Sequence, residues 1–206
     1  MSSGDEHGQE QVDKINILIL AAGSSSRLGQ SKQLLEVTGV PLLRKTVLTA
    51  LATTSPHITV VLGHDFKKHK EVIQNLNIDI LHHTDWQQGM GSSLKAGVSS
   101  ILKNHSDTQA IVILVCDQPY LTAEHLNALI NTHRTSEATI VASAYASTTG
   151  VPALFDQSMF EELLKLKDDQ GAKKIMEKHA GSIVEIEFAS GEIDIDTPSD
   201  YARLTR

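Results

Sequence analysis

A short loop directly after the apolar run 15–20 concentrates groups that can bind phosphate. Gly23 and Gly29 allow the backbone to turn and to approach a ligand closely, and the serines that follow Gly23 leave the amide donors unobstructed. Arg27 and Lys32 add two cations to the same segment. Amide donors, a flexible backbone and positive charge together describe a loop that binds a polyphosphate.

The spacing of the glycines separates this loop from better-known nucleotide-binding loops. Five residues lie between Gly23 and Gly29, whereas a Walker A loop has four and continues with Lys-Ser or Lys-Thr. The loop also lacks the G-x-G-x-x-G pattern of a dinucleotide-binding fold. The alternative interpretation is a plain strand-to-helix turn with two solvated cations. Phosphate binding is favoured over it because an open sheet binds its ligands at this edge.

A second stretch rich in Gly and Ser, residues 86–93, comes before a helical pattern. It predicts exposed backbone amides at a helix N-terminus, which suit an anion or the edge of a nucleobase. Gly89 and Gly91 begin a dinucleotide fingerprint, but Leu94 stands where the third glycine belongs, so dinucleotide binding is not expected. The alternative is a Gly-rich helix start that binds nothing.

Asp117 follows the apolar run 111–115. A buried strand that ends in an aspartate places a carboxylate at the carboxyl edge of the sheet, in the crevice that the first loop faces. A hard oxygen ligand there suits Mg²⁺, which keeps several waters and bridges phosphate oxygens. The alternative, a capping role for Asp117 in the next helix, is disfavoured because Pro119 delays that helix and Thr122 is a better cap.

Asp194 and Asp196 alternate with isoleucines near the C-terminus. The alternation predicts a short strand with both carboxylates on one face. Thr197 and Pro198 predict the start of a helix, in which Asp200 has a capping role. The ten histidines show no H-x-x-x-H or H-E-x-x-H spacing, and we interpret them as surface or incidental residues.

The elements that must position these residues alternate along the chain. Strands are expected at 15–20, 58–62, 78–81, 111–115 and 139–144, and helices after Pro41, at 66–75, after Gly91 and after Thr122. This alternation predicts an α/β fold, with a doubly wound, mostly parallel sheet covered by helices on both faces. Residues 15–206 are expected to form a single domain, and the polar, acidic residues 1–14 a disordered leader or a tag-derived segment.

Composition excludes several classes of function. The 206 residues carry a net charge of −7, which argues against binding nucleic acid or an anionic membrane surface. The single cysteine, Cys116, excludes an internal disulfide, suits a reducing cytoplasm and is expected in the core. No apolar run is long enough to span a membrane. A cytoplasmic protein is therefore expected.

The motif L-A-A-G-x-S-x-R-x-G-x-x-K at residues 20–32 resembles the signature of the MobA-like NTP transferase family, whose fold is that of the nucleotide-diphospho-sugar transferases. The chain looks most like the branch that attaches a nucleotide to the molybdenum cofactor, the molybdenum cofactor cytidylyltransferases. G-M-G-S-S-L-x-x-G from residue 89, C-D-Q-P from residue 116 and D-x-D-T-P from residue 194 extend the resemblance over nearly the whole chain.

The resemblance implies a set of site residues. Catalytic roles fall to Arg27, Lys32 and Asp117, and Mg²⁺ binding to Asp117 and Asp196, with Asp194 as the alternative ligand. The implied nucleotide-binding residues are Leu20, Ala21, Ala22, Gly23, Ser25, Arg27, Lys32, Gln87, Gly91 and Ser93. The implied acceptor-binding residues are Gln118, Gly150, Pro152, Asp169 and Gly171, although the family's Gly-Asp pair is Asp168-Asp169 here.

The implied reaction is Mg²⁺-dependent transfer of a nucleoside monophosphate to the terminal phosphate of molybdopterin or the molybdenum cofactor, with release of pyrophosphate. Such a phosphate is already ionised at neutral pH, so no general base is required. Ala22 stands where the guanylyl-transferring branch has glycine, and its extra methyl group favours a pyrimidine, hence CTP. The implied partners are the triphosphate, the phosphorylated pterin acceptor and a molybdoenzyme that receives the product.

Three alternatives stay open at this point. The first is a cytidylyl- or uridylyltransferase acting on a sugar or polyol phosphate. The second is a non-catalytic accessory protein that binds a cofactor, which would not need two separated carboxylates. The third is an oxidoreductase with a Rossmann-like fold, which would need a complete dinucleotide fingerprint.

Overall fold

The computed structural model describes residues 14–55, 57–136 and 138–204, with the side chain of Arg27 left out. The strands are β1 (Ile15–Ala21), β2 (Glu36–Val37), β3 (Val40–Pro41), β4 (His57–Leu62), β5 (Asp79–His82), β6 (Ala110–Val115), β7 (Ile140–Tyr145), β8 (Thr148–Asp156) and β9 (Val184–Glu187). The helices are α1 (Leu42–Leu51), α2 (Phe66–Ile73), α3 (Met90–Asn104), α4 (Ala123–Ser136), α5 (Phe160–Leu164), α6 (Lys173–Lys178) and α7 (Pro198–Leu204). Short 3-10 helices include η1 (Ser26–Leu28), η2 (Lys32–Leu34) and η3 (Trp86–Gln88).

One seven-stranded sheet with the order β5-β4-β1-β6-β8-β7-β9 organises the molecule. The neighbours β5, β4, β1 and β6 run parallel, and β9 runs parallel to β7. Only β8 among the described strands of this sheet is antiparallel to both of its neighbours. The predicted mostly parallel α/β fold is therefore confirmed.

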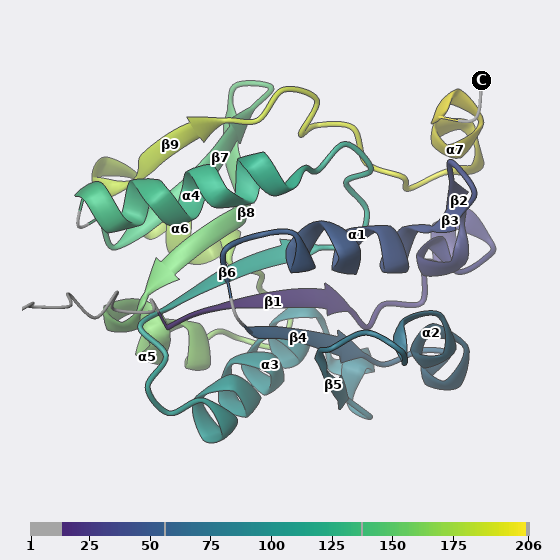
Figure 1. Cartoon of the computed structure of the whole chain (residues 1–206), viewed down its shortest axis with the longest axis horizontal. Coiled ribbons are helices and arrows are strands. Elements are labelled where there is room, and N and C mark those ends of the chain that lie inside the picture. Colours follow the sequence, from purple (N-terminus) through teal and green to yellow (C-terminus); the bar gives the residue numbers. More distant parts are fainter. Residues whose placement is uncertain (1–13, 56, 137, 205–206) are drawn as a thin grey trace, which may run out of the picture.

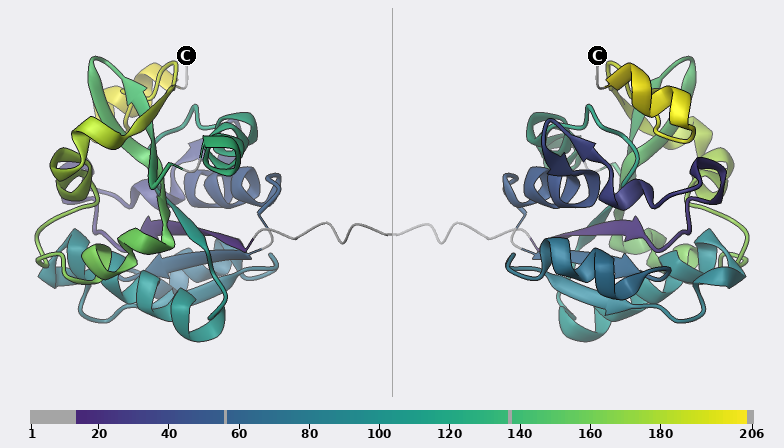
Figure 2. Two further views of the ribbon diagram at one scale, coloured as in Figure 1. Left: turned by 90° about the vertical axis from the view of Figure 1, so that its left-hand side faces the viewer. Right: turned by 90° about the vertical axis from the view of Figure 1, so that its right-hand side faces the viewer.

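Helices cover both faces of the sheet, as Figures 1 and 2 show. In β1, Ile17 and Ile19 pack in the same cluster as α1 and α4, whereas Leu18 and Leu20 pack in the cluster that includes α3 and α5. All seven residues of β1 are buried, because a central parallel strand has a helix layer on each side. A strand in this position needs apolar side chains on both faces, which explains the nearly continuous apolar run at residues 15–20.

The carboxyl ends of the central parallel strands are the edge at which an open α/β sheet binds its ligands. Figure 1 shows β1, β4 and β6 pointing toward the same side of the molecule, where α2, α7 and the β2–β3 hairpin also lie. Strands β1 and β6 are direct neighbours, with Leu20 opposite Val115. The two segments that follow them, the Gly/Ser loop and Asp117, therefore begin side by side.

One sequence-based expectation about strands is wrong. Residues 193–196 form no strand, and the last strand of the sheet is β9, which pairs with β7 and ends at Glu187. Residues 150–155 belong to the nine-residue strand β8. The error at 193–196 arises because pairing partners far along the chain decide which segments of alternating polar and apolar residues join a sheet.

Several local expectations are confirmed. The side chain of Asp200 accepts hydrogen bonds from the backbone N–H and the hydroxyl of Thr197, at 2.9 and 2.7 Å, which caps α7. Cys116 is a buried thiol whose pKa burial raises to about 12. The predicted leader lies outside the described residues, apart from Lys14. Histidines are not all incidental, however, because His69 is completely buried.

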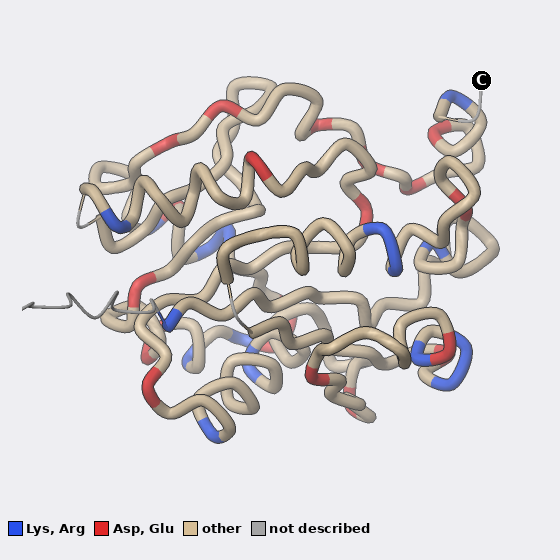
Figure 3. The backbone as a smooth tube through the Cα atoms, in the orientation of Figure 1, with Lys and Arg blue, Asp and Glu red and all other residues tan. Residues whose placement is uncertain are grey.

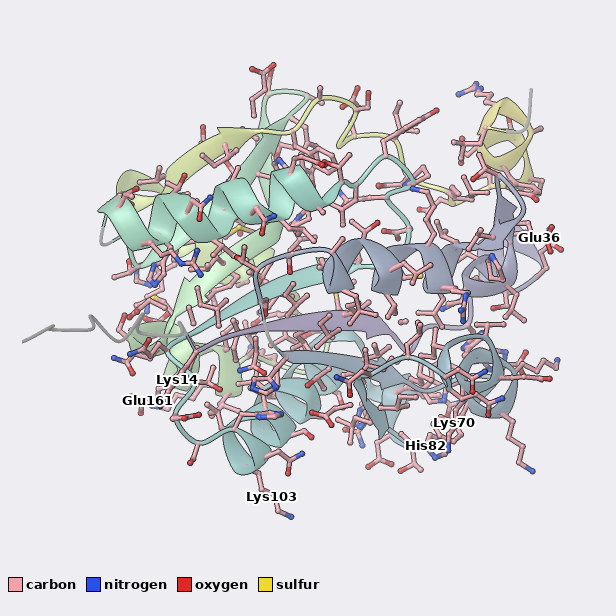
Figure 4. All side chains as sticks on the ribbon, in the orientation of Figure 1. Lys14, Glu36, Lys70, His82, Lys103 and Glu161 are labelled. Atoms are coloured by element: carbon pink, nitrogen blue, oxygen red, sulfur yellow. The ribbon has the colours of Figure 1, made fainter. Side chains whose placement is uncertain are left out.

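Among the described side chains, no Asp, Glu, Lys or Arg is fully buried. Figure 3 shows Lys and Arg spread over several elements, with a group of basic residues on α2, and Lys103 in Figure 4 points away from the protein. Across the described part of the chain, no helix combines the length and the apolar character that crossing a membrane requires.

Helix α3 packs unusually close to the sheet at Gly97. A Cβ added there would lie 2.5 Å from Cδ1 of Leu18 and 2.9 Å from Cγ2 of Val61. We predict that Gly97→Ala lowers the free energy of unfolding by about 1–3 kcal/mol, because the strain in the tightly packed core outweighs the roughly 1 kcal/mol of helix propensity gained. The measurement is urea denaturation followed by circular dichroism. Gly181, where an added Cβ meets nothing within 4 Å, is the matched control, and equal losses in both variants would contradict the prediction.

Candidate active site

Three segments far apart in sequence meet at the carboxyl edge of the central strands. The Gly/Ser loop continues β1, and Asp117 follows β6 by two residues. The C-terminal segment is brought to the same place because the backbone N–H of Ile195 donates a hydrogen bond to the carbonyl of Asp117 at 3.1 Å. Asp196 thereby comes close to Asp117 although no strand places it there.

Lys32 joins the three segments. Its Nζ donates to Oδ2 of Asp117 and to Oδ1 of Asp196, each at 2.9 Å. The lysine side chain is 16% exposed and the two aspartates are 23% and 35% exposed. Burial alone would lower the pKa of Lys32, but the charges of the two aspartates and their hydrogen bonds outweigh burial and raise that pKa. The ammonium is therefore fully charged at neutral pH.

Asp194 adds a third carboxylate to this region. Desolvation, followed by the negative charges of Asp117 and Asp196, raises its pKa to about 6. Lys32 opposes this shift only in part. Three acidic groups thus share one nearby lysine, so the site has negative charge to spare for a cationic ligand.

The Gly/Ser loop is held in shape by its own side chains. Gln33 is buried and donates from Nε2 to the carbonyls of Ala21 and Gly23, at 3.2 and 3.0 Å. Oγ of Ser25 accepts the backbone N–H of Lys32 at 3.2 Å. Gly29 ends η1 with φ at 72°, a conformation that glycine adopts without strain. A Cβ at Gly23 would meet nothing within 4 Å, which leaves the backbone there open to a ligand.

These groups line one cleft of about 380 Å³. Ten of the residues predicted from the sequence line it: Leu20, Ala21, Ala22, Gly23, Ser25, Lys32, Gln87, Ser93, Asp117 and Asp196. Ser24, Ser26, Trp86, Gly89 and Met90, from the two stretches that the sequence marked as ligand-binding, line it as well. Gln33, Val115 and Cys116 also line the cleft and were not predicted to do so. Their positions beside predicted residues are the one signal that could have found them.

Gly91, predicted to face the nucleotide, packs elsewhere. Its backbone N–H donates to the carbonyl of Asp168 at 2.8 Å, and the N–H of Ser92 points to the same oxygen at 3.3 Å. A Cβ at Gly91 would lie 2.1 Å from the carbonyl oxygen of Lys167. These two amides at the start of α3 are therefore occupied by the segment 167–170 and are not exposed, contrary to the expectation.

The predicted acceptor residues lie in two other places. Gln118 is buried and donates from Nε2 to the carbonyls of Val151 and Gly191, each at 3.1 Å, which joins it to the buried β8 residues Gly150 and Pro152. Asp169 and Gly171 belong to the segment that packs on the start of α3, where Gly171 lies next to Met90. None of these five residues lines the cleft described above. Arg27 lies in η1, and its side chain is outside the described part.

The donor set fits a hard divalent cation. In the described part of the chain, no group of three His, Cys, Asp or Glu side chains is arranged to hold a metal by itself. Two aspartates beside an open cleft are nevertheless what a Mg²⁺-type ion uses, because such an ion completes its shell with water and substrate phosphates. Asp117 and Asp196 are the residues that would hold it.

Comparisons with known proteins agree with this geometry. Residues 17–183 match the family described as MobA-like NTP transferase domain, as the sequence motifs predict. The chain is 30% identical over 204 residues to the purine catabolism protein PucB of Bacillus subtilis (strain 168), which covers 92% of this chain and 95% of that one. It is 26% identical over 190 residues to the molybdenum cofactor cytidylyltransferase of Escherichia coli (strain K12), with coverage of 92% and 95%.

One relative carries a name of another class. The nicotine blue oxidoreductase of Paenarthrobacter nicotinovorans is 26% identical over 212 residues, with coverage of 96% of this chain and 99% of that one.

Among solved structures, Rv0371c from Mycobacterium tuberculosis H37Rv is similar with a TM-score of 0.79 at 25% identity, covering 93% and 97% of the two chains. Its complex with manganese is similar at 24% identity with a TM-score of 0.77 and the same coverage.

We predict that Lys32→Met destabilises the metal-free protein by about 1–3 kcal/mol, because the partly buried Asp117 and Asp196 lose the cation between them. The free energy of unfolding is measured in urea with a chelator present. Lys95→Met is the matched control: Lys95 pairs with Asp168 at 2.6 Å, but that pair is more exposed, and we expect its loss to cost no more than about 1 kcal/mol. Equal effects of the two substitutions would contradict the structural importance assigned to Lys32.

Proposed function

Because the chain belongs to the family of MobA-like NTP transferase domains, we propose that it transfers a nucleotidyl group from a nucleoside triphosphate to a phosphorylated acceptor. The observation that carries this proposal is the position of Lys32, which bridges Asp117 and Asp196 in the cleft that the Gly/Ser loop lines. A loop for phosphates and two carboxylates from separate segments suit phosphoryl chemistry.

We assign each group of site residues a role from its position in the cleft. The loop residues Gly23–Ser26 face the cleft and would cradle the triphosphate with their backbone amides. Lys32 would offset the negative charge that grows on the α-phosphate and on the leaving pyrophosphate. Arg27 would contact the same phosphates through its planar fork. Asp117 and Asp196 would hold a divalent metal, Mg²⁺ in our proposal, which would supply positive charge to neutralise the phosphates.

For the substrates we propose CTP and the terminal phosphate of molybdopterin or the molybdenum cofactor. The methyl group of Ala22 on the cleft wall supports a pyrimidine, and the relative named molybdenum cofactor cytidylyltransferase supports both substrates. The acceptor would lie near Gln118, Gly150, Pro152, Asp169 and Gly171. We further propose a cytoplasmic location and delivery of the product to a molybdoenzyme. A sugar or polyol phosphate is the alternative acceptor.

The relative named as an oxidoreductase makes redox chemistry the second candidate. Against it, the chain has no complete dinucleotide fingerprint, and a hydride-transfer site has no need of Lys32 between two aspartates. An accessory protein that only binds a cofactor would not need that arrangement either.

One experiment separates these candidates. The protein is incubated with Mg²⁺ or Mn²⁺, each of the four nucleoside triphosphates, and molybdopterin, and pyrophosphate is assayed. A parallel set with NADH or NADPH and an oxidised dye follows absorbance at 340 nm. Pyrophosphate release that depends on acceptor supports the proposal, whereas oxidation of the reduced nucleotide without pyrophosphate would replace it with the redox candidate.

We predict that Asp117→Asn lowers turnover at least a hundredfold, because a neutral amide neither holds a divalent cation tightly nor balances Lys32. Steady-state pyrophosphate release at saturating metal is the measurement. Asp107→Asn is the control, since Asp107 forms a surface ion pair with Lys14 at 2.6 Å and should keep its turnover. More than about a tenth of wild-type turnover in Asp117→Asn would remove Asp117 from the reaction.

Base choice gives a further prediction. In competition at equal concentrations, CTP should be consumed faster than GTP, because Ala22 narrows the cleft against a purine. One methyl group discriminates by only about 1–3 kcal/mol, so some GTP use is expected. Ala22→Gly should shift the ratio toward GTP while transfer continues. Faster use of GTP by the wild-type protein would refute the role of Ala22 and leave the transferase proposal standing.

A further inference from the structure

His69 is an unusual residue for an exposed helix. Helix α2 presents Lys67, Lys68 and Lys70 to solvent, yet His69 between them is 0% exposed. Its Nε2 lies 2.6 Å from Oγ of Ser31, 38 residues earlier in the chain. In Figure 1, α2 follows β4 on the side to which β1 points.

A chain of hydrogen bonds links Ser31 to the backbone of the Gly/Ser loop. The Ser31 hydroxyl donates to Oε1 of Gln33 at 2.9 Å, and Nε2 of Gln33 donates to the carbonyls of Ala21 and Gly23. Oε1 of Gln33 also accepts the hydroxyl of Ser25 at 3.2 Å. One buried glutamine therefore ties together the end of β1, the turn after it and the residue before Lys32.

The hydrogen bonds of Ser31 and Gln33 determine which atom donates in the contact between His69 and Ser31. Because the Ser31 proton is used toward Gln33, Nε2 of His69 must donate to Oγ of Ser31. Nδ1 of His69 then carries no proton, and it is buried without a hydrogen-bond partner among the described residues. Burial lowers the pKa of His69, in keeping with a neutral ring.

We propose that His69 is a positioning residue for the phosphate loop: by holding Ser31, it fixes Gln33 and through it the backbone at Ala21 and Gly23 that faces the triphosphate. His69 does not line the cleft itself, so it acts through Ser31. The inference rests on the proposed function and adds to it a residue outside the cleft. The sequence motif of the loop contains Lys32 but gives no sign of this support from α2.

A double-mutant cycle tests the role. Dissociation constants for CTP and for CMP, with Mg²⁺, are measured for the wild type, His69→Leu, Ser31→Ala and the double variant. We expect each single substitution to weaken CTP about tenfold and CMP less than twofold, because only the outer phosphates depend on the loop. The double variant should bind CTP no more weakly than the single ones, since contacting residues are coupled. His69→Gln, whose amide can replace the Nε2 donor, should restore part of the affinity.

His125 provides a matched control. It is partly buried, its Nε2 lies 2.7 Å from Oγ of the buried Ser143, and burial lowers its pKa as it does that of His69. Unlike His69, it stacks on Phe188 and contacts no residue of the loop in the described hydrogen bonds. His125→Leu should lower the free energy of unfolding while the dissociation constant for CTP stays within twofold of the wild type.

The outcomes separate the inference from the proposed function. A wild-type protein that binds none of the four nucleoside triphosphates contradicts both. Should GTP bind more tightly than CTP, the cycle is run with GTP and GMP. Wild-type binding combined with unchanged affinity in His69→Leu, additive losses in the double variant or equal losses for triphosphate and monophosphate overturns the role of His69 alone. If His69→Leu does not fold, Ser31→Ala and His69→Gln carry the same comparison.

Discussion

The pair of hydrogen bonds from Lys32 to Asp117 and Asp196 is the interaction on which the site depends. The three residues come from a loop after β1, from the segment after β6 and from the C-terminal segment, so no local structure could bring them together. Their charges would repel the third aspartate and each other without the lysine, because partly buried carboxylates interact strongly at this distance. The sheet order contributes directly, because β1 lies beside β6 and the segments that carry Lys32 and Asp117 therefore begin side by side.

An acidic protein can bind phosphate only through groups placed locally at the site. With a net charge of −7, the chain has no general attraction for anions, and Figure 3 shows both signs of charge spread over several elements. Phosphate binding must then come from backbone amides and from a few placed cations. Such local binding needs a loop of defined shape, and Gln33, with bonds to Ala21 and Gly23, provides that shape from within the cleft wall.

Glycines in this fold serve two different purposes, which sequence patterns do not distinguish. Gly23 leaves the backbone open to the cleft, whereas Gly91 and Gly97 remove a Cβ where another segment packs closely. At Gly91 the neighbour is the backbone of residues 167–170, and at Gly97 it is Leu18 and Val61. The segment 167–170 contains the predicted acceptor residue Asp169 and is followed directly by Gly171, so these two residues lie next to the start of α3, which borders the cleft.

The sequence alone determined the sheet and its ligand edge. Apolar runs such as 15–20 and 111–115 are long, local signals, and the residue after a buried parallel strand must lie at its carboxyl edge, so the meeting of the Gly/Ser loop with Asp117 was predictable. The capping of α7 by Asp200 was predictable for the same reason, since it involves neighbours in the chain. Tertiary structure alone decided the course of residues 193–196, the packing of Gly91 and the burial of His69 beside Ser31. Each of these depends on a partner at least 38 residues away, and a local pattern of polar and apolar residues carries no information about such a partner.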